Sequence, residues 1–529
     1  MPAESLPLAG RMEILRQRLA SIPERMGEAL ARTAYSANIK ERRDHSCALF
    51  AENAELLAQA AHIPVHLGSM AVAVRSVQRA LDLQSGDVAL LNDPFAGGTH
   101  LPDITMVSPV NDGERRIGYV ANRAHHADVG GVAPGSMALT DSIHDEGVRL
   151  PPVRWYAAGK ERTDVRDLLL DNVRTPSERL GDLRAQRAAN EVGLRAFCEL
   201  RTRYDEREFA ELIHTLWEYA ERRVRRTISE LPDGRYPAED FIEGDGFTDT
   251  PIRIAVTVRI EGDQANIDFA GTDPAVRGPL NCPMSVTHAA VAYVFICLAG
   301  EGLPHNAGMY RPIRVVAPDG CVVNAAYPSA VAAGNVETSQ RIVDVLLAAV
   351  EQAAPRRIPA ASAGTMSSLT LGGINPDTGE EFSYYETIGG GSGASAAGPG
   401  ESGIHTHMTN TRNTPIEALE QAFPLRVRRY ALAAGSAGRG THDGGEGIIR
   451  EITELAPMRG ALLADRHRTG PPGRADGLSG KPGHACILRA DGSTSKLGSK
   501  AAFELAVGDT IQVVTPGAGG HGPVQLVGA

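Results

Sequence analysis

Apolar residues near the N-terminus recur at steps of three and four positions, which is the spacing of one face of an α-helix. They are Met12, Leu15, Leu19, Ile22, Met26 and Leu30. Pro23 lies inside this pattern and predicts either a kink or the start of a second helix, because proline lacks a backbone N–H donor. Ser21 and Glu24 have the spacing of a capping box, which favours a new helix at this point.

The pattern changes several times along the chain. Residues 34–152 are punctuated by glycine and hold short apolar runs at 88–91 and 117–120, which predict strands. Residues 177–230 return to helical spacing and predict a pair of long helices whose many arginines lie on solvated faces. Strict alternation over residues 252–260, followed by a Glu-Gly-Asp turn and a second strand, predicts a β-hairpin.

The C-terminal half mixes helix, loop and strand patterns. Residues 336–353 predict a helix, and residues 389–403 predict a Gly/Ser/Ala-rich loop that brings backbone close to a ligand or partner. We therefore expect an α+β protein, a large mixed, multi-lobed fold with Gly-rich strand-end loops, a central long-helix pair and a β-rich C-terminal part. The expected divisions are an N-terminal lobe with the candidate metal site, a long helical segment, a mixed α/β lobe with the Gly-rich loop, and a β-rich lobe, at residues 1–175, 176–235, 236–430 and 431–529.

Composition narrows the class of protein. A chain of 529 residues with 42% hydrophobic and 22% charged residues predicts a folded, enzyme-sized protein with at least two lobes. The formal net charge of -11 opposes binding to nucleic acid. Six scattered cysteines predict reduced thiols, not a disulfide framework. The sequence shows neither a secretory leader pattern nor an apolar run long enough to span a membrane, so we expect a cytoplasmic protein without membrane contact.

Two glycine-rich turns at predicted strand ends concentrate the polar chemistry. NDPFAGGTHLPD presents His100 and Asp103 three residues apart, and RAHHADVGG supplies His125 and His126. With Asp44 in ERRDHS, they provide a His/His/carboxylate set without sulfur, which suits a divalent ion such as Zn, Mn or Fe(II). Such an ion would acidify water and polarise an amide carbonyl.

Simpler interpretations of these residues stay open. A His and an Asp in a Gly-rich turn commonly bond their own loop backbone. Successive strand residues face opposite sides, so only one of His125 and His126 should face a common site, and the other packs or supports it. His66 either lines a pocket or makes core hydrogen bonds, and Glu146, with His144, belongs either to the site or to a solvated acidic loop.

The sequence gives little support to a covalent nucleophile or to a nucleotide-binding loop in this chain. It contains no GxSxG elbow, and no cysteine has a setting that indicates a covalent nucleophile. The Gly-rich loop lacks the lysine of a phosphate-binding P-loop, and no lysine occurs between Lys160 and Lys481. Any ATP is therefore expected on another chain.

The two glycine-rich motifs, taken together, resemble those of the hydantoinase B/oxoprolinase family, which includes the large subunits of acetone and acetophenone carboxylases. Further segments resemble family blocks in family order and cover nearly the whole chain. They are ERRDHSCALF, HIPVHLGSM, GTDPAVRGPLN, NVETSQRIVD, HTHMTNTRNTPIEALE and REITELAPMRGALLADRHR. The tail PGAGGHG differs from the PGGGGYG form common in the family.

The resemblance implies a hydrolase that opens the C–N bond of a small cyclic amide of the hydantoin or 5-oxoproline type. It implies a hetero-oligomer in which a hydantoinase A-type partner, with an actin-like fold, binds ATP with Mg. The implied metal ligands in this chain are His100, Asp103 and His125, with Asp44 as a fourth. The candidates for orienting the metal ligands or for transferring a proton are His126, His66 and Glu146.

Two alternatives remain beside this hypothesis. The chain could be a subunit of an ATP-dependent ketone carboxylase, which would use the same metal site and the same kind of partner. It could also be a non-catalytic scaffold for an ATPase partner, with structural histidines. Bicarbonate-dependent turnover of a ketone would support the first, and full activity after loss of His100 and Asp103 would support the second.

Overall fold

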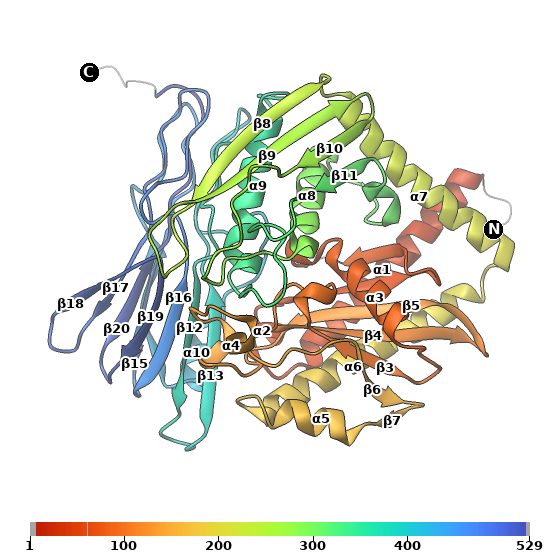
Figure 1. Cartoon of the computed structure of the whole chain (residues 1–529), viewed down its shortest axis with the longest axis horizontal. Coiled ribbons are helices and arrows are strands. Elements are labelled where there is room, and N and C mark those ends of the chain that lie inside the picture. The colour runs from red at the N-terminus through yellow and green to blue at the C-terminus, as the bar shows by residue number, and fades with distance from the viewer. Residues whose placement is uncertain (1–6, 61, 525–529) are drawn as a thin grey trace.

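The computed structural model describes residues 7–60 and 62–524, and its helices and sheets confirm the α+β class (Figure 1). The helices are α1 (Leu8–Thr33), α2 (Ala37–Lys40), α3 (Ser69–Ala80), α4 (Ile143–Glu146), α5 (Thr163–Leu170), α6 (Pro176–Arg201), α7 (Glu206–Ser229), α8 (Met284–Ala299), α9 (Ser339–Glu351) and α10 (Ile416–Ala422). Among these helices, none has both the length and the apolar run that crossing a bilayer requires. All six cysteines are free thiols, as predicted.

Seven strands form the N-terminal sheet, in the order β2-β1-β5-β4-β3-β6-β7, with antiparallel neighbours. Their bounds are β1 (His45–Phe50), β2 (Leu56–Ala60), β3 (Val88–Leu91), β4 (Asp103–Asp112), β5 (Arg115–His125), β6 (Val153–Ala157) and β7 (Lys160–Glu161). Cys47 and Leu49 of β1 share a core with α1 and α6, whereas Ala48 and Phe50 share a core with α3. Because helices cover both faces, β1 is buried along its whole length.

Helix α1 is continuous from Leu8 to Thr33, so the predicted restart at Ser21 is wrong. The Ser21 hydroxyl caps no new helix and donates instead to the carbonyl oxygen of Arg18, at 2.8 Å. Pro23 is buried within the helix, and the apolar face around it packs against α6. Burial of this long apolar face outweighs the local signals for a break.

Other predicted elements are confirmed. The long-helix pair is α6 and α7, and the hairpin is formed by β9 (Ile252–Glu261) and β10 (Gln264–Asp268). With β8 (Gly234–Ile242) and β11 (Ile313–Val316), these strands form a second sheet in the order β11-β10-β9-β8. Helices α8 and α9 pack with this sheet in the largest hydrophobic cluster of the described chain.

Two further sheets make up the β-rich part and share one core. One has the order β13-β12-β16-β19, with β12 (Ser368–Ile374), β13 (Glu381–Thr387), β16 (Met458–Leu463) and β19 (Lys500–Leu505). The other has the order β14-β15-β20-β17-β18, with β14 (Leu425–Leu432), β15 (Ile448–Glu454), β20 (Thr510–Val514), β17 (His484–Leu488) and β18 (Thr494–Leu497). Strands β12 and β13 precede residue 431. The β-rich part therefore includes strands from the expected segment 236–430 as well as from the expected segment 431–529.

Candidate metal centre

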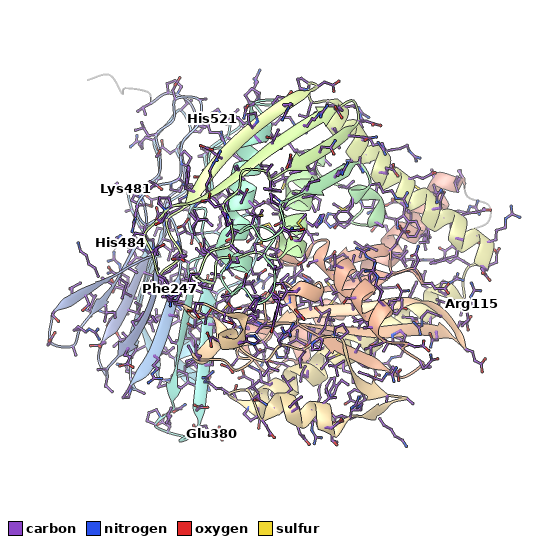
Figure 2. The ribbon with its side chains drawn as sticks, in the orientation of Figure 1. Arg115, Phe247, Glu380, Lys481, His484 and His521 are labelled. Carbon is purple, nitrogen blue, oxygen red and sulfur yellow. The ribbon has the colours of Figure 1, made fainter. Side chains whose placement is uncertain are left out.

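Strand β5 leads from the surface of the protein into its interior. It begins at Arg115, at the edge of the view in Figure 2, and ends at His125, which is buried. His125 pairs across the sheet with Asp103, the first residue of β4. Opposed residues of an antiparallel pair have Cβ atoms about 5 Å apart, so strand register alone sets this imidazole beside this carboxylate.

His100 reaches the same point from the loop that precedes β4. A short 3-10 turn begins at Pro94, and Gly97 then adopts a left-handed conformation with φ of 100°. Gly97 also lies so close to α3 that a Cβ atom there would come within 2.5 Å of the backbone nitrogen of Ala73. Glycine thereby allows the tight return of the chain that presents His100.

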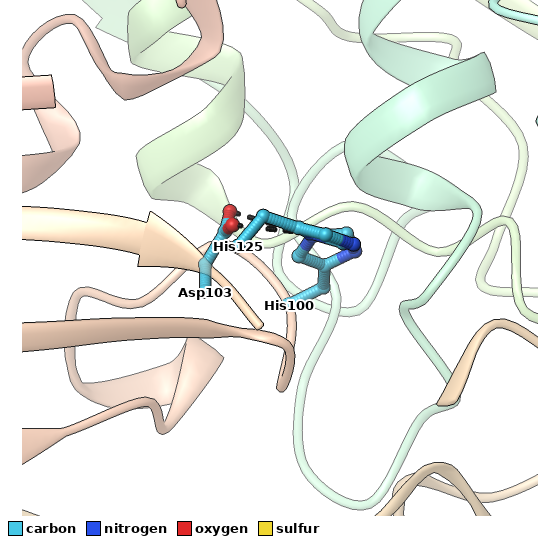
Figure 3. A group of neighbouring side chains, drawn as sticks. All are labelled: His100, Asp103 and His125. Carbon is cyan, nitrogen blue, oxygen red and sulfur yellow. Dashed lines mark hydrogen bonds and ion pairs between the residues drawn. The ribbon is translucent and has the colours of Figure 1, made fainter. Parts of the chain in front are cut away.

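His100, Asp103 and His125 form a compact cluster (Figure 3), in which one ligand-type atom from each lies within 4.8 Å of the others. Nε2 of His100 is 3.4 Å from Oδ2 of Asp103 and 3.2 Å from Nδ1 of His125. Nδ1 of His125 is 3.4 Å from Oδ1 of Asp103. All three side chains are at most 2% exposed, so the cluster is shielded from bulk water.

The orientation of His100 is set from outside the cluster. Its Nδ1 lies 3.1 Å from the carbonyl oxygen of Ala332, which leaves the lone pair of Nε2 facing the other two residues. Glu146 holds this backbone: its Oε1 accepts from the N–H groups of Val331 and Ala332, at 2.8 and 2.9 Å. Burial raises the pKa of Glu146 to about 7. Glu146 therefore acts on the cluster through the backbone that orients His100.

The Asp103 carboxylate has two further partners. Thr99 donates a short hydrogen bond to Oδ2, and Nε2 of His66 lies 3.3 Å from the same oxygen. The other ring nitrogen of His66 is 2.9 Å from the hydroxyl of Ser46. His66 thus contacts the cluster directly, although its ring is fixed by β1.

Burial and mutual charge shift the pKa values of the three side chains in different directions. Burial alone would raise the pKa of Asp103, but His100 and His66 hold that pKa well below its usual range. Burial alone would lower the pKa of His100, but the Asp103 carboxylate outweighs burial and raises it. Burial lowers the pKa of His125. Ionised Asp103 and neutral His125 are the forms that bind a metal ion, whereas an ion would have to displace a proton from His100.

A cavity of about 20 Å³ lies against the three side chains. This volume accommodates one water molecule or one ion. Nε2 of His125 is buried without a hydrogen-bond partner in the described part of the chain. Two imidazoles and a carboxylate are a common donor set for Zn, Mn and Fe(II). These residues therefore fit a divalent ion.

Asp44 lies at the same cavity without joining the compact cluster. Its backbone carbonyl accepts from the N–H of His125 at 3.0 Å, and its side chain is 7% exposed. It lines the cavity beside His100 and Asp103, but its carboxylate is not among the three groups that converge within 4.8 Å. Asp44 as a fourth ligand stays a prediction.

His126 faces the opposite side of the sheet from His125, as strand alternation predicts. Its Nε2 lies 3.0 Å from Oε1 of Gln186 on α6. Burial lowers the pKa of His126 to about 4. The structure therefore brings His125 to the cluster and leaves His126 against a helix.

Two residues beside the cluster were missed by the analysis of the sequence. Nδ2 of Asn335 lies 3.0 Å from Nε2 of His100, and the ring of Tyr385 lies 4.6 Å from that of His125, centroid to centroid. Asn335 belongs to a π-helical turn, Gly334–Thr338, that immediately precedes α9. Such turns are frequent at functional sites. The block NVETSQRIVD begins at Asn335, but nothing in its spacing indicates contact with a histidine more than two hundred residues away.

Comparison with known proteins gives one consistent family. The sequence profile described as hydantoinase B/oxoprolinase matches residues 9–524. The chain is 37% identical to 5-oxoprolinase 1 of Arabidopsis thaliana over 98% of its own length, which is 42% of the length of that enzyme. It is 32% identical to a protein of a Pseudomonas species that is named as the B-type subunit of a D-/L-hydantoinase, over 95% of this chain and 88% of that one.

A solved structure shares the fold over almost the whole chain. It is the ATP-dependent caprolactamase of Pseudomonas jessenii, with a TM-score of 0.90 at 28% sequence identity. The match covers 97% of this chain and 90% of that one.

Proposed function

The chain belongs to the hydantoinase B/oxoprolinase family, and from this premise we propose that it is the metal-binding subunit of an ATP-dependent enzyme that hydrolyses cyclic amides. The buried cluster of His100, Asp103 and His125 is the observation that carries the proposal. The names of its relatives, a 5-oxoprolinase, a hydantoinase subunit and a caprolactamase, support a cyclic amide as substrate.

In the proposed site, His100, Asp103 and His125 hold a Zn, Mn or Fe ion, with Asp44 as a candidate fourth ligand. Such an ion supplies Lewis-acid chemistry that polarises an amide carbonyl and acidifies water. Thr99 and His66 fix the Asp103 carboxylate, and the amide of Asn335 lies beside His100, where it could orient a carbonyl oxygen or a water. We keep His66 as the candidate for proton transfer; its two ring nitrogens face Ser46 and Asp103.

We assign ATP to a partner chain of the hydantoinase A type, in a hetero-oligomer. The absence of a P-loop lysine from this sequence supports that assignment, as does the name of the Pseudomonas relative, which is itself one subunit of a hydantoinase. Five-membered lactam and imide rings are stabilised by resonance and can close again after opening. Phosphorylation of the substrate or of an intermediate by the partner would drive the reaction forward.

Substrate entry requires the cavity to widen, because about 20 Å³ holds an ion or a water but no ring. The lining of this cavity includes Met366, Met408 and Thr409, which lie outside regular strands and helices. We propose that cyclic amides enter by displacing these side chains.

The metal content of the purified chain tests the proposal. Elemental mass spectrometry should find about one ion per wild-type chain. His100→Ala and Asp103→Ala should each lose it, whereas His214→Ala, at an exposed position on α7, should retain it. Circular dichroism establishes that all variants are folded. Equal metal content in all four proteins would contradict the ligand assignment.

Activity is then measured with a hydantoinase A-type partner. ATP turnover that depends on a cyclic amide, and not on bicarbonate, is expected. Turnover that requires bicarbonate and a ketone would replace hydrolysis by carboxylation, and full activity in the two ligand variants would favour a scaffold.

A further inference from the structure

A second cavity, of about 280 Å³, lies between the N-terminal sheet and the second sheet. Its walls come from β2, α3, α8 and β11, together with the short 3-10 turn Ala307–Tyr310. Most of the lining is apolar and includes Leu56, Val72, Val291, Ile313 and Val315. This size is near the lower end of the range for small-molecule sites.

Three side chains that can donate hydrogen bonds line this cavity, namely Arg75, Tyr310 and His288. Arg75 on α3 forms no ion pair with any residue that the structure describes. The hydroxyl of Tyr310 is buried and lacks a hydrogen-bond partner within residues 7–60 and 62–524. His288 on α8 is half-buried beside them.

Burial and neighbouring charges act on these groups. Burial and the neighbouring Arg79 lower the pKa of Arg75, and burial and Arg75 lower the pKa of His288. Glu55 also lines the cavity, and its carboxylate partly offsets the lowering of the pKa of Arg75, while one of its oxygens accepts from the side chain of Asn53. Among the described residues, the Tyr310 hydroxyl is a buried donor without an acceptor, and a bound anion would restore the free energy that this lack costs.

We propose that this cavity is a binding site for a small carboxylate with a short apolar body. The carboxylate would pair with the guanidinium of Arg75 and accept from Tyr310 and His288, while the apolar body would contact Val72 and Val291. A single guanidinium among apolar walls suits a monoanion better than a phosphate dianion, which needs more donors.

The site is separate from the metal centre but shares a segment with it. Gly68 lines the cavity, and two residues before it His66 contacts Asp103. The hydroxyl of Ser69 donates to the carbonyl oxygen of His66 and accepts from Arg123. An occupant of the cavity therefore contacts the turn that holds His66, although no metal ligand lines the cavity wall.

Calorimetric titration of hexanoate into the full-length chain tests the proposal. Wild-type protein should bind one hexanoate per chain. Arg75→Leu should weaken binding at least about tenfold, because it removes a charge-assisted pair. Tyr310→Phe should weaken binding about three- to tenfold, because it removes one neutral hydrogen bond.

Matched controls separate a specific site from general effects. Arg79→Leu, one turn further along α3 at an exposed position, should bind hexanoate like wild type. Hexanamide, which has nearly the same shape without the charge, should bind at least about tenfold more weakly. All variants are compared by thermal melting monitored by circular dichroism.

Three results would overturn the assignment. They are no saturable binding of hexanoate to wild type up to about 10 mM, equal binding by folded Arg75→Leu, and equal or tighter binding of hexanamide or hexylamine. None of these outcomes depends on metal binding or on a partner chain, so the proposed hydrolase function stands or fails separately.

Discussion

Glu146→Ala should weaken metal binding although Glu146 contacts no proposed ligand. Oε1 of Glu146 accepts from the N–H groups of Val331 and Ala332, and the carbonyl of Ala332 faces Nδ1 of His100. Removing the carboxylate releases this backbone, so His100 loses the partner that directs its Nε2 toward Asp103. The expected effect passes through orientation, not through the charge of a ligand.

The magnitude follows from the contacts that are lost. Two buried N–H groups lose their acceptor, which should lower the free energy of unfolding by about 1–3 kcal/mol for each group. Loss of a partner that orients a metal-binding histidine typically lowers metal affinity about 10- to 100-fold. That range corresponds to about 1.4–2.7 kcal/mol of binding free energy.

The assay is a competitive titration of Zn²⁺ between the folded chain and a chromophoric chelator. Glu146→Gln keeps an oxygen that can accept from both N–H groups and should lose less affinity than Glu146→Ala. Asp145→Asn, a neighbouring acid in the same short helix, should bind like wild type. Wild-type affinity in folded Glu146→Ala would refute the idea that this backbone contact positions His100.

Two further predictions concern stability. Burial raises the pKa of Glu454 from 4.5 to about 8, so the folded state holds a proton that the unfolded state releases, and the free energy of unfolding should fall by roughly 2–4 kcal/mol between pH 5 and pH 8. Urea unfolding of Glu454→Gln should show a smaller loss, and an unchanged loss would contradict this account. Gly97→Ala should cost at least about 2 kcal/mol more than Gly113→Ala, because both glycines have positive φ but only Gly97 would bring a Cβ atom against Ala73. Equal urea midpoints for the two variants would show that the loop adapts.

The candidate ligands could be found from the sequence because each lies in a local motif. His100 and Asp103 share one glycine-rich turn, and strand alternation indicated that only one of His125 and His126 would face it. Strand alternation did not say which of the two; the family resemblance implied His125, and the register of β4 and β5, which pairs His125 with Asp103, agrees with it. The register depends on how the two strands pack together, so it cannot be predicted from the residues of one strand.

Patterns of three to ten residues determined much of the secondary structure by themselves. The long-helix pair and the hairpin at 252–269 follow from the spacing of apolar side chains, because that spacing decides which face each element can bury. The continuity of α1 through Pro23 was instead decided by its long contact with α6.

Only the tertiary structure brought Asn335, Ala332 and Glu146 to His100, and only it formed the cavity around Arg75. These residues come from segments far apart in the chain, and their contacts depend on how whole sheets and helices pack together. Local spacing constrains the conformation of a segment and the side that it buries. It does not specify which distant segment will contact that side, because that contact is determined by the free energy of the whole folded chain.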